Sequence, residues 1–174
     1  MERLDKLIAC LAEMGFKPKI SKFEDRLRMQ KIACLMELMG TDIGYHFYST
    51  HIRGPYSTAL TQDIFSSIEK VETLKTACNL EEKTRNAAKK IAEISRLDPY
   101  SLEIMATYLF FVIKEGKNEK DAVLALKKLK PFIADDQMAV GLSRAKQLIP
   151  LYSENELADA RKEFAEIETI DMRD

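Results

Sequence analysis

The chain has 174 residues, of which 46% are hydrophobic and 32% charged, and these values indicate a folded globular domain rather than a disordered chain. The net charge of −1 lacks the positive excess with which most nucleic-acid-binding domains attract phosphates. The last 24 residues form the most acidic part, with eight acidic and three basic residues. Such a tail is typical of a solvated helix face and, less often, of a partner surface.

The cysteines and the N-terminus predict a cytoplasmic protein. Cys10, Cys34 and Cys78 form no CxxC pair and lie among apolar or small residues, so we expect buried, free thiols in a reducing compartment. Acidic residues among the first five positions do not fit a signal peptide. No apolar run reaches the roughly 18 residues that a membrane span requires, so we expect no membrane association.

Two helices are predicted at the start of the chain, over residues 2–14 and 22–39, and a glycine follows each. Apolar residues recur in both at the spacing of one helix face. Ser21 precedes Glu24 by three residues, which is the pattern of a capping box. We therefore expect these two side chains to bind backbone N–H groups at the start of the second helix.

Helical periodicity stops at residues 45–52, where aromatic and β-branched residues predict one short strand. A Gly-Pro turn follows at residues 54–55, since proline cannot continue a strand. Ser57 or Thr58 then suits the N-cap of a helix over residues 57–70.

Five further helices are predicted in the second half of the chain. The helix over 99–115 is apolar on more than one side, which indicates a central, buried element. Asp98 suits its N-cap and Pro99 its first position. The other four helices are expected over 79–95, 119–130 (capped by Asn118) and 135–149, and after Ser153, which forms a second capping box with Glu156.

These elements predict a mainly all-α fold, a globular bundle of about eight helices with at most one or two short strands near residues 45–52. We expect one domain over residues 1–174, because no linker or internal repeat divides the chain. A subdivision into an N-terminal part, 1–97, and a helical part, 98–174, is the alternative.

No motif for catalysis, metal binding or cofactor binding occurs in the sequence. The two histidines, His46 and His51, are five residues apart and would lie on opposite faces of a strand, so they make a poor pair of metal ligands. HExxH, GxSxG and glycine-rich phosphate-binding motifs are absent. We therefore expect no catalytic residues, metal or cofactor, with an enzyme of unrecognised motif as an alternative.

The most unusual segment is residues 45–57, which concentrates aromatic residues, histidine and arginine around the Gly-Pro turn. This composition is typical of protein-binding surfaces. The alternative for each aromatic residue is a place in the core. The strand edge would also allow a homodimer. Our candidate protein-binding residues are Tyr45, Phe47, Tyr48, His51, Arg53 and Tyr56.

The order of helix, strand, helix and helix over residues 22–95 also suggests a winged-helix DNA-binding regulator. The helix at 79–95 would then be the recognition helix. Its long connector, its acidic residues and the new helix at Asp98-Pro99 argue against this interpretation. On this alternative the nucleic-acid-binding residues would be Lys83, Arg85, Asn86, Lys89 and Lys90.

A string of motifs between Phe23 and Asp63 carries a family resemblance. It comprises Gln30-Lys31 in an apolar helix, Gly40, Tyr45 with Phe47, and Gly54-Pro55-Tyr56-Ser57 with Leu60 and Asp63. This string resembles the YwgA-like family of uncharacterised prokaryotic proteins. It is more distantly similar to the SocA-like (Panacea) phage-associated domain of antitoxins and proteolytic adaptors. The resemblance implies a small helical module that binds a protein, such as a toxin or a protease, and is not an enzyme.

Overall fold

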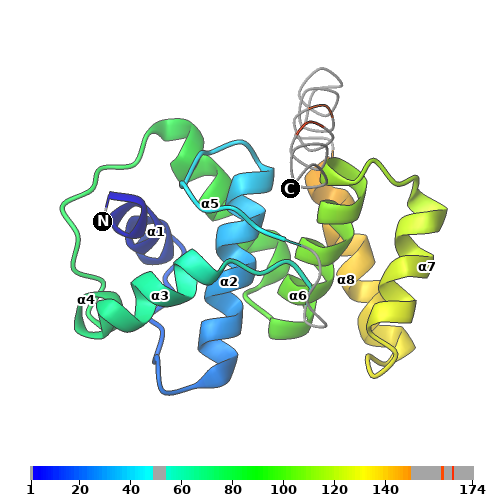
Figure 1. Cartoon of the computed structure of the whole chain (residues 1–174), viewed down its shortest axis with the longest axis horizontal. Coiled ribbons are helices and arrows are strands. Elements are labelled where there is room, and N and C mark those ends of the chain that lie inside the picture. The colour runs from blue at the N-terminus through cyan, green and yellow to red at the C-terminus, as the bar shows by residue number, and fades with distance from the viewer. Residues whose placement is uncertain (1, 49–53, 150–161, 163–165, 167–174) are drawn as a thin grey trace.

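The computed structural model describes residues 2–48, 54–149, 162 and 166. These residues form eight α-helices, of which α2 and α6 are the central pair, with α1, α3 and α4 on one side and α7 and α8 on the other (Figure 1). The elements are α1 (Glu2–Glu13), α2 (Phe23–Leu38), α3 (Thr58–Ser66), α4 (Ile68–Glu72), α5 (Glu82–Ser95), α6 (Pro99–Leu109), the π-helical turn η1 (Phe110–Lys114), α7 (Glu119–Leu129) and α8 (Asp135–Leu148).

The predicted all-α fold is confirmed, although the helices are divided differently. The helix expected over residues 57–70 is interrupted at Ser67, whose φ and ψ of −144° and 41° are not helical, so it forms α3 and α4. The helix expected after Ser153 lies outside the described residues, apart from the helical positions 162 and 166.

Helix α6 occupies the centre of the fold, as its apolar sequence predicts. Every residue from Ser101 to Phe111 is buried, and α6 contacts α2, α5, α7 and α8. Helix α8 packs closely on α6 at Gly141, where a Cβ atom would lie 2.6 Å from the Ile104 side chain. Glycine is therefore required at this crossing, because any side chain would push α8 away from α6.

One cluster of buried apolar side chains includes residues of every helix from α1 to α8. Contacts of α2 with α6 and of α5 with α8 cross the boundary that the alternative subdivision would place at residue 97. In the part of the chain described here, no helix is long and apolar enough to cross a membrane.

All three cysteines are free thiols, Cys10 and Cys34 being buried and Cys78 partly buried. Burial raises the pKa of the Cys10 and Cys34 thiols to about 12, because an apolar interior disfavours the thiolate. These two residues therefore behave as small hydrophobic core residues, as expected from their neighbours.

Three of the predicted helix caps are present. The side chains of Ser57, Asp98 and Asn118 accept the backbone N–H groups of Leu60, Ser101 and Asp121, respectively. Each of these bonds satisfies a donor that has no partner within its own helix.

The capping box predicted at Ser21 and Glu24 is wrong. Helix α2 begins one residue after Lys22, its N-cap, which makes no side-chain capping bond. The Glu24 carboxylate pairs instead with Arg28 one turn along the same helix, at 2.8 Å. An i,i+4 ion pair on an exposed helix face thus replaces the expected cap.

The strand predicted over residues 45–52 is also wrong where the structure describes it. Residues 45–47 form no ladder, and the segment pairs only at Tyr48, which exchanges two backbone hydrogen bonds of 3.1 Å with Tyr56. The chain instead follows the helices, because the Glu37 side chain of α2 accepts the N–H groups of Gly44 and Tyr45 at 2.6 and 2.9 Å. Residues 49–52 lie outside the described part.

Candidate functional site

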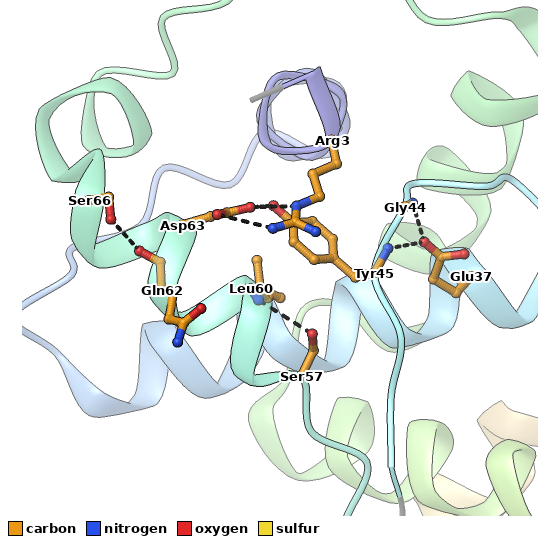
Figure 2. A network of polar contacts seen from close by, with 9 residues as sticks. All are labelled: Arg3, Glu37, Gly44, Tyr45, Ser57, Leu60, Gln62, Asp63 and Ser66. Carbon is orange, nitrogen blue, oxygen red and sulfur yellow. Dashed lines mark hydrogen bonds and ion pairs between the residues drawn. The ribbon is translucent and has the colours of Figure 1, made fainter. Parts of the chain in front are cut away.

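Tyr45 lies in the core rather than on the predicted binding surface. Only 3% of it is exposed, and its hydroxyl donates a hydrogen bond to Asp63 Oδ2 at 2.8 Å. Arg3 of α1 binds the same carboxylate at 2.7 and 3.3 Å, and its guanidinium lies 4.9 Å from the centre of the Tyr45 ring (Figure 2). Tyr45 therefore connects its loop to α1 and α3, and it is not part of the candidate binding surface.

The charges in this network stabilise one another. The hydrogen bond from Arg3 lowers the pKa of Asp63, while burial and then the neighbouring carboxylate raise the pKa of Tyr45. On α2, burial raises the pKa of Glu37 even though two N–H groups bind its carboxylate. The loop at residues 44–45 is thus held by two carboxylates, those of Glu37 and Asp63.

The turn at residues 54–57 is bound directly to α2 by the polar pair Gln30-Lys31. The Gln30 side chain forms two hydrogen bonds of 2.9 Å with the backbone of Ser57, accepting from its N–H and donating to its carbonyl. Lys31 Nζ donates to the Pro55 carbonyl at 2.8 Å, and Lys31 is only 1% exposed. These bonds explain why two polar residues interrupt an apolar helix.

The same turn also rests on the central helix α6. Gly54 has a φ of +81°, in the left-handed region that favours glycine, and a Cβ atom there would collide with Thr107 Oγ1. Gly54 and Pro55 are both buried. The turn is therefore a fixed part of the structure, and it fixes the position of Tyr56.

Beside this turn, a groove of about 370 Å³ lies between α2 and α3. We call it the α2–α3 groove. Two of its phenylalanines are half exposed, Phe23 at 50% and Phe65 at 52%. The Arg26 guanidinium lies between them, 5.6 and 5.7 Å from the two ring centres. The lining residues are Phe23, Arg26, Leu27, Gln30, Lys31, Tyr56, Thr61, Ile64 and Phe65.

The charge of the groove is one-sided. Its two charged residues, Arg26 and Lys31, are both cations, and no carboxylate lines it. Arg26 donates one hydrogen bond, of 2.5 Å, to the carbonyl of Ile20, and among the described residues no acidic side chain pairs with it. Two neighbouring acids on α2, Glu24 and Asp25, both bind Arg28 at 2.8 Å.

The predicted binding residues are divided between the core and the surface. Phe47 is partly buried against the core, Tyr48 is 58% exposed, and Tyr56 lines the groove with its hydroxyl 2.6 Å from Thr61 Oγ1. His51 and Arg53 lie outside the described residues.

Sequence reasoning did not identify Phe23, Arg26 or Phe65. The two phenylalanines lie off the apolar stripes of their helices, as their exposure confirms, and such an off-stripe aromatic residue is a usable signal for a surface site.

The basic residues proposed for DNA binding are exposed on α5, but part of their charge is neutralised within the chain. Arg85 and Lys89 face Glu13 of α1 at 3.6 and 3.2 Å, and Lys90 faces Glu93 at 3.6 Å. Lys83 and Asn86 are exposed on the same helix. Only three residues separate the end of α5 from the start of α6, which leaves no room there for the hairpin of a wing.

A second and more open hollow, of about 1190 Å³, lies beside α4. It carries charges of both signs, and its Lys70 and Asp5 pair at 2.6 Å. His46 is exposed and lines neither hollow, and no group of three potential metal ligands occurs among the described residues. The α2–α3 groove is thus the more distinctive candidate, because two half-exposed phenylalanines lie beside Arg26 there and no carboxylate lines it.

Comparison with known proteins adds no further constraint. No protein-family model, curated protein or solved structure matches the chain. The resemblance to the YwgA-like and SocA-like proteins therefore stays a prediction.

Proposed function

We propose that this protein is a non-enzymatic regulatory or adaptor module that binds a protein partner through the α2–α3 groove and the adjoining Tyr48. One observation carries the proposal: two half-exposed phenylalanines flank an arginine at the rim of a groove. Aromatic residues and arginine supply most of the binding energy in protein interfaces. Covering one such ring contributes about 1–2 kcal/mol, because half of its surface is still exposed.

The rigidity of the adjoining turn supports this proposal. Bonds from Gln30 and Lys31, together with the packing of Gly54 on α6, hold residues 54–57 before any partner arrives. Binding therefore requires little ordering of the groove wall, and less of the interaction energy is lost to conformational entropy. A phage-associated, antitoxin-like role is the finer form of this proposal, and it is supported by the resemblance of residues 23–63.

DNA binding and catalysis have weaker support. The pairing of Arg85 and Lys89 with Glu13 reduces the positive charge that α5 would offer to phosphates. A catalytic reading requires a pocket with a buried carboxylate near a histidine, and His46 lines neither hollow.

Capture of partners by affinity-tagged full-length protein tests the proposed function. We expect Phe65→Ser to lose the partner that the unchanged protein retains, because it removes half of the aromatic rim. Phe132→Ser is the matched control, since Phe132 is 61% exposed and does not line the groove. Equal capture of every partner by both variants would show that the groove is not the binding surface.

A further inference from the structure

The charges around the α2–α3 groove restrict what its occupant can be. The acidic residues nearest in the sequence to Arg26, Glu24 and Asp25, are bound by Arg28, and Asp25 also accepts the N–H of Lys19 at 2.9 Å. The only acidic residue of α3, Asp63, is bound by Arg3 and Tyr45. These three carboxylates are therefore already engaged by other groups.

Arg26 is also held in place for a ligand. Its bond to the Ile20 carbonyl and its position between two ring faces fix the guanidinium, which carries five N–H donors in a planar fork. Within the described part of the chain that bond is its one hydrogen bond. The remaining donors suit a carboxylate, which accepts two parallel bonds from such a fork.

A partner that covered the two phenylalanines would also remove water from Arg26. If the partner carried only neutral apolar groups there, a cation would be desolvated without compensation, and a basic partner would add repulsion. A carboxylate beside the apolar residue removes both penalties. A groove of about 370 Å³ has room for one apolar side chain and a neighbouring carboxylate.

We propose, building on the function proposed above, that the α2–α3 groove binds an acidic–apolar segment of a partner protein. An apolar side chain of the segment packs against Phe23 and Phe65, and an adjacent Asp or Glu side chain binds the Arg26 guanidinium. Lys31 also lines the groove, where its Nζ holds the turn through the Pro55 carbonyl.

Binding of labelled peptides to the full-length protein, followed by fluorescence anisotropy, tests this inference. Three short peptides with amidated C-termini carry the same leucine and phenylalanine, flanked by glutamate, by glutamine or by lysine. We expect the glutamate peptide to bind about tenfold more tightly than the glutamine peptide and the lysine peptide to bind most weakly. This preference should decrease with added salt.

Variants of Arg26 connect the preference to one residue. In Arg26→Gln the difference between the glutamate and glutamine peptides should nearly disappear, and Arg26→Lys should restore part of it, since lysine keeps the charge but not the planar fork. Lys120→Gln is the matched control, because it removes a positive charge from an exposed position on α7. Near-ultraviolet circular dichroism checks that each variant is folded.

Several results would overturn the inference. Equal affinity for the glutamate and glutamine peptides, or an unchanged preference in Arg26→Gln, would show that the occupant is not selected by its carboxylate. If none of the peptides binds, the inference is also overturned. The proposed function would still stand in that case, provided that Phe65→Ser loses the partner that the unchanged protein captures. A dimer of the unchanged protein that Phe65→Ser dissociates would assign the groove to a second copy of the chain.

Discussion

Three arginines in the described part of the chain, Arg3, Arg26 and Arg28, lie against aromatic rings, and only Arg26 pairs with no carboxylate there. Arg3 lies over Tyr45 and binds Asp63, whereas Arg26 lies between Phe23 and Phe65 and pairs with no acidic residue among those described. In the first combination the arginine, the tyrosine and the carboxylate bind one another, and these contacts fix the positions of α1 and α3. The second has no carboxylate among the described residues, and this difference is the basis of the proposed binding surface.

The two sites also differ in what surrounds them. Tyr45 is 3% exposed, while Phe23 and Phe65 are each about half exposed, at 50% and 52%. The turn at residues 54–57 connects the two regions, since α3, which carries Asp63, begins directly after it and Tyr56 lines the groove. Substitutions in one region should therefore change stability, and those in the other should change binding.

The largest effect is expected at the turn that supports both regions. Gly54→Val should lower the free energy of unfolding by about 3 kcal/mol, because it places a β-branched residue at positive φ and against Thr107. Chemical denaturation measures this change. Unfolding at the same denaturant concentration as the unchanged protein would mean that the turn is not packed on α6 as described.

A smaller loss of stability is expected from substitutions in the network of Arg3, Tyr45 and Asp63. Asp63→Ala should cost about 2 kcal/mol, because it leaves the Tyr45 hydroxyl and Arg3 without their shared acceptor. The pKa of Asp63 in the folded protein lies below its ordinary value of 3.8. Its contribution is thus complete above that pH and is lost as the pH falls through the lower, folded value.

Denaturation over a range of pH tests this expected contribution of Asp63 to stability. The acid-induced loss of stability should be smaller in Asp63→Asn than in the unchanged protein, because the amide does not titrate. An identical pH dependence in both proteins would show that the Arg3–Asp63 pair contributes little to folding.

A substitution of Arg26 should change stability less than the substitutions of Gly54 and Asp63. Arg26→Gln should alter the free energy of unfolding by no more than about 0.5 kcal/mol, because Arg26 is partly exposed and forms no ion pair with any described residue. Thermal unfolding of Arg26→Gln beside Asp63→Ala measures the contrast directly. A loss in Arg26→Gln as large as that in Asp63→Ala would place Arg26 among the structural residues.

The smallest effect is expected on α5. In a gel shift with double-stranded DNA at low salt, we expect the unchanged protein and the variants Lys83→Gln and Lys90→Gln to behave alike. The chain has no net positive charge, and Arg85 and Lys89 already face Glu13. A salt-sensitive complex that depends on these lysines would favour the DNA-binding alternative.

The sequence predicts those features that depend on neighbouring residues. Helical periodicity identified α6 as central, and the caps at Ser57, Asp98 and Asn118 were recognised from short local patterns. The Ser21 pattern failed although it is equally local, because Arg28 competes for Glu24.

The groove could not be predicted in the same way, because its parts come from distant segments. Phe23 and Phe65 are 42 positions apart, and only the fold places both rings beside Arg26. Nor does the sequence distinguish buried Tyr45 from exposed Tyr48, because what decides is the distant Asp63 acceptor. Composition alone points to Tyr56, which lines the groove, but not to Phe23, Arg26 or Phe65.

The most direct test of this contrast is to follow the Nε–H signals of Arg3 and Arg26 by NMR while the glutamate-flanked peptide is added to the full-length protein. Our account predicts that the Arg26 signal shifts on binding, that the glutamine-flanked peptide produces a much smaller shift, and that the Arg3 signal does not move. Binding of the glutamate peptide with an unchanged Arg26 signal, or with a shift at Arg3 instead, would contradict it.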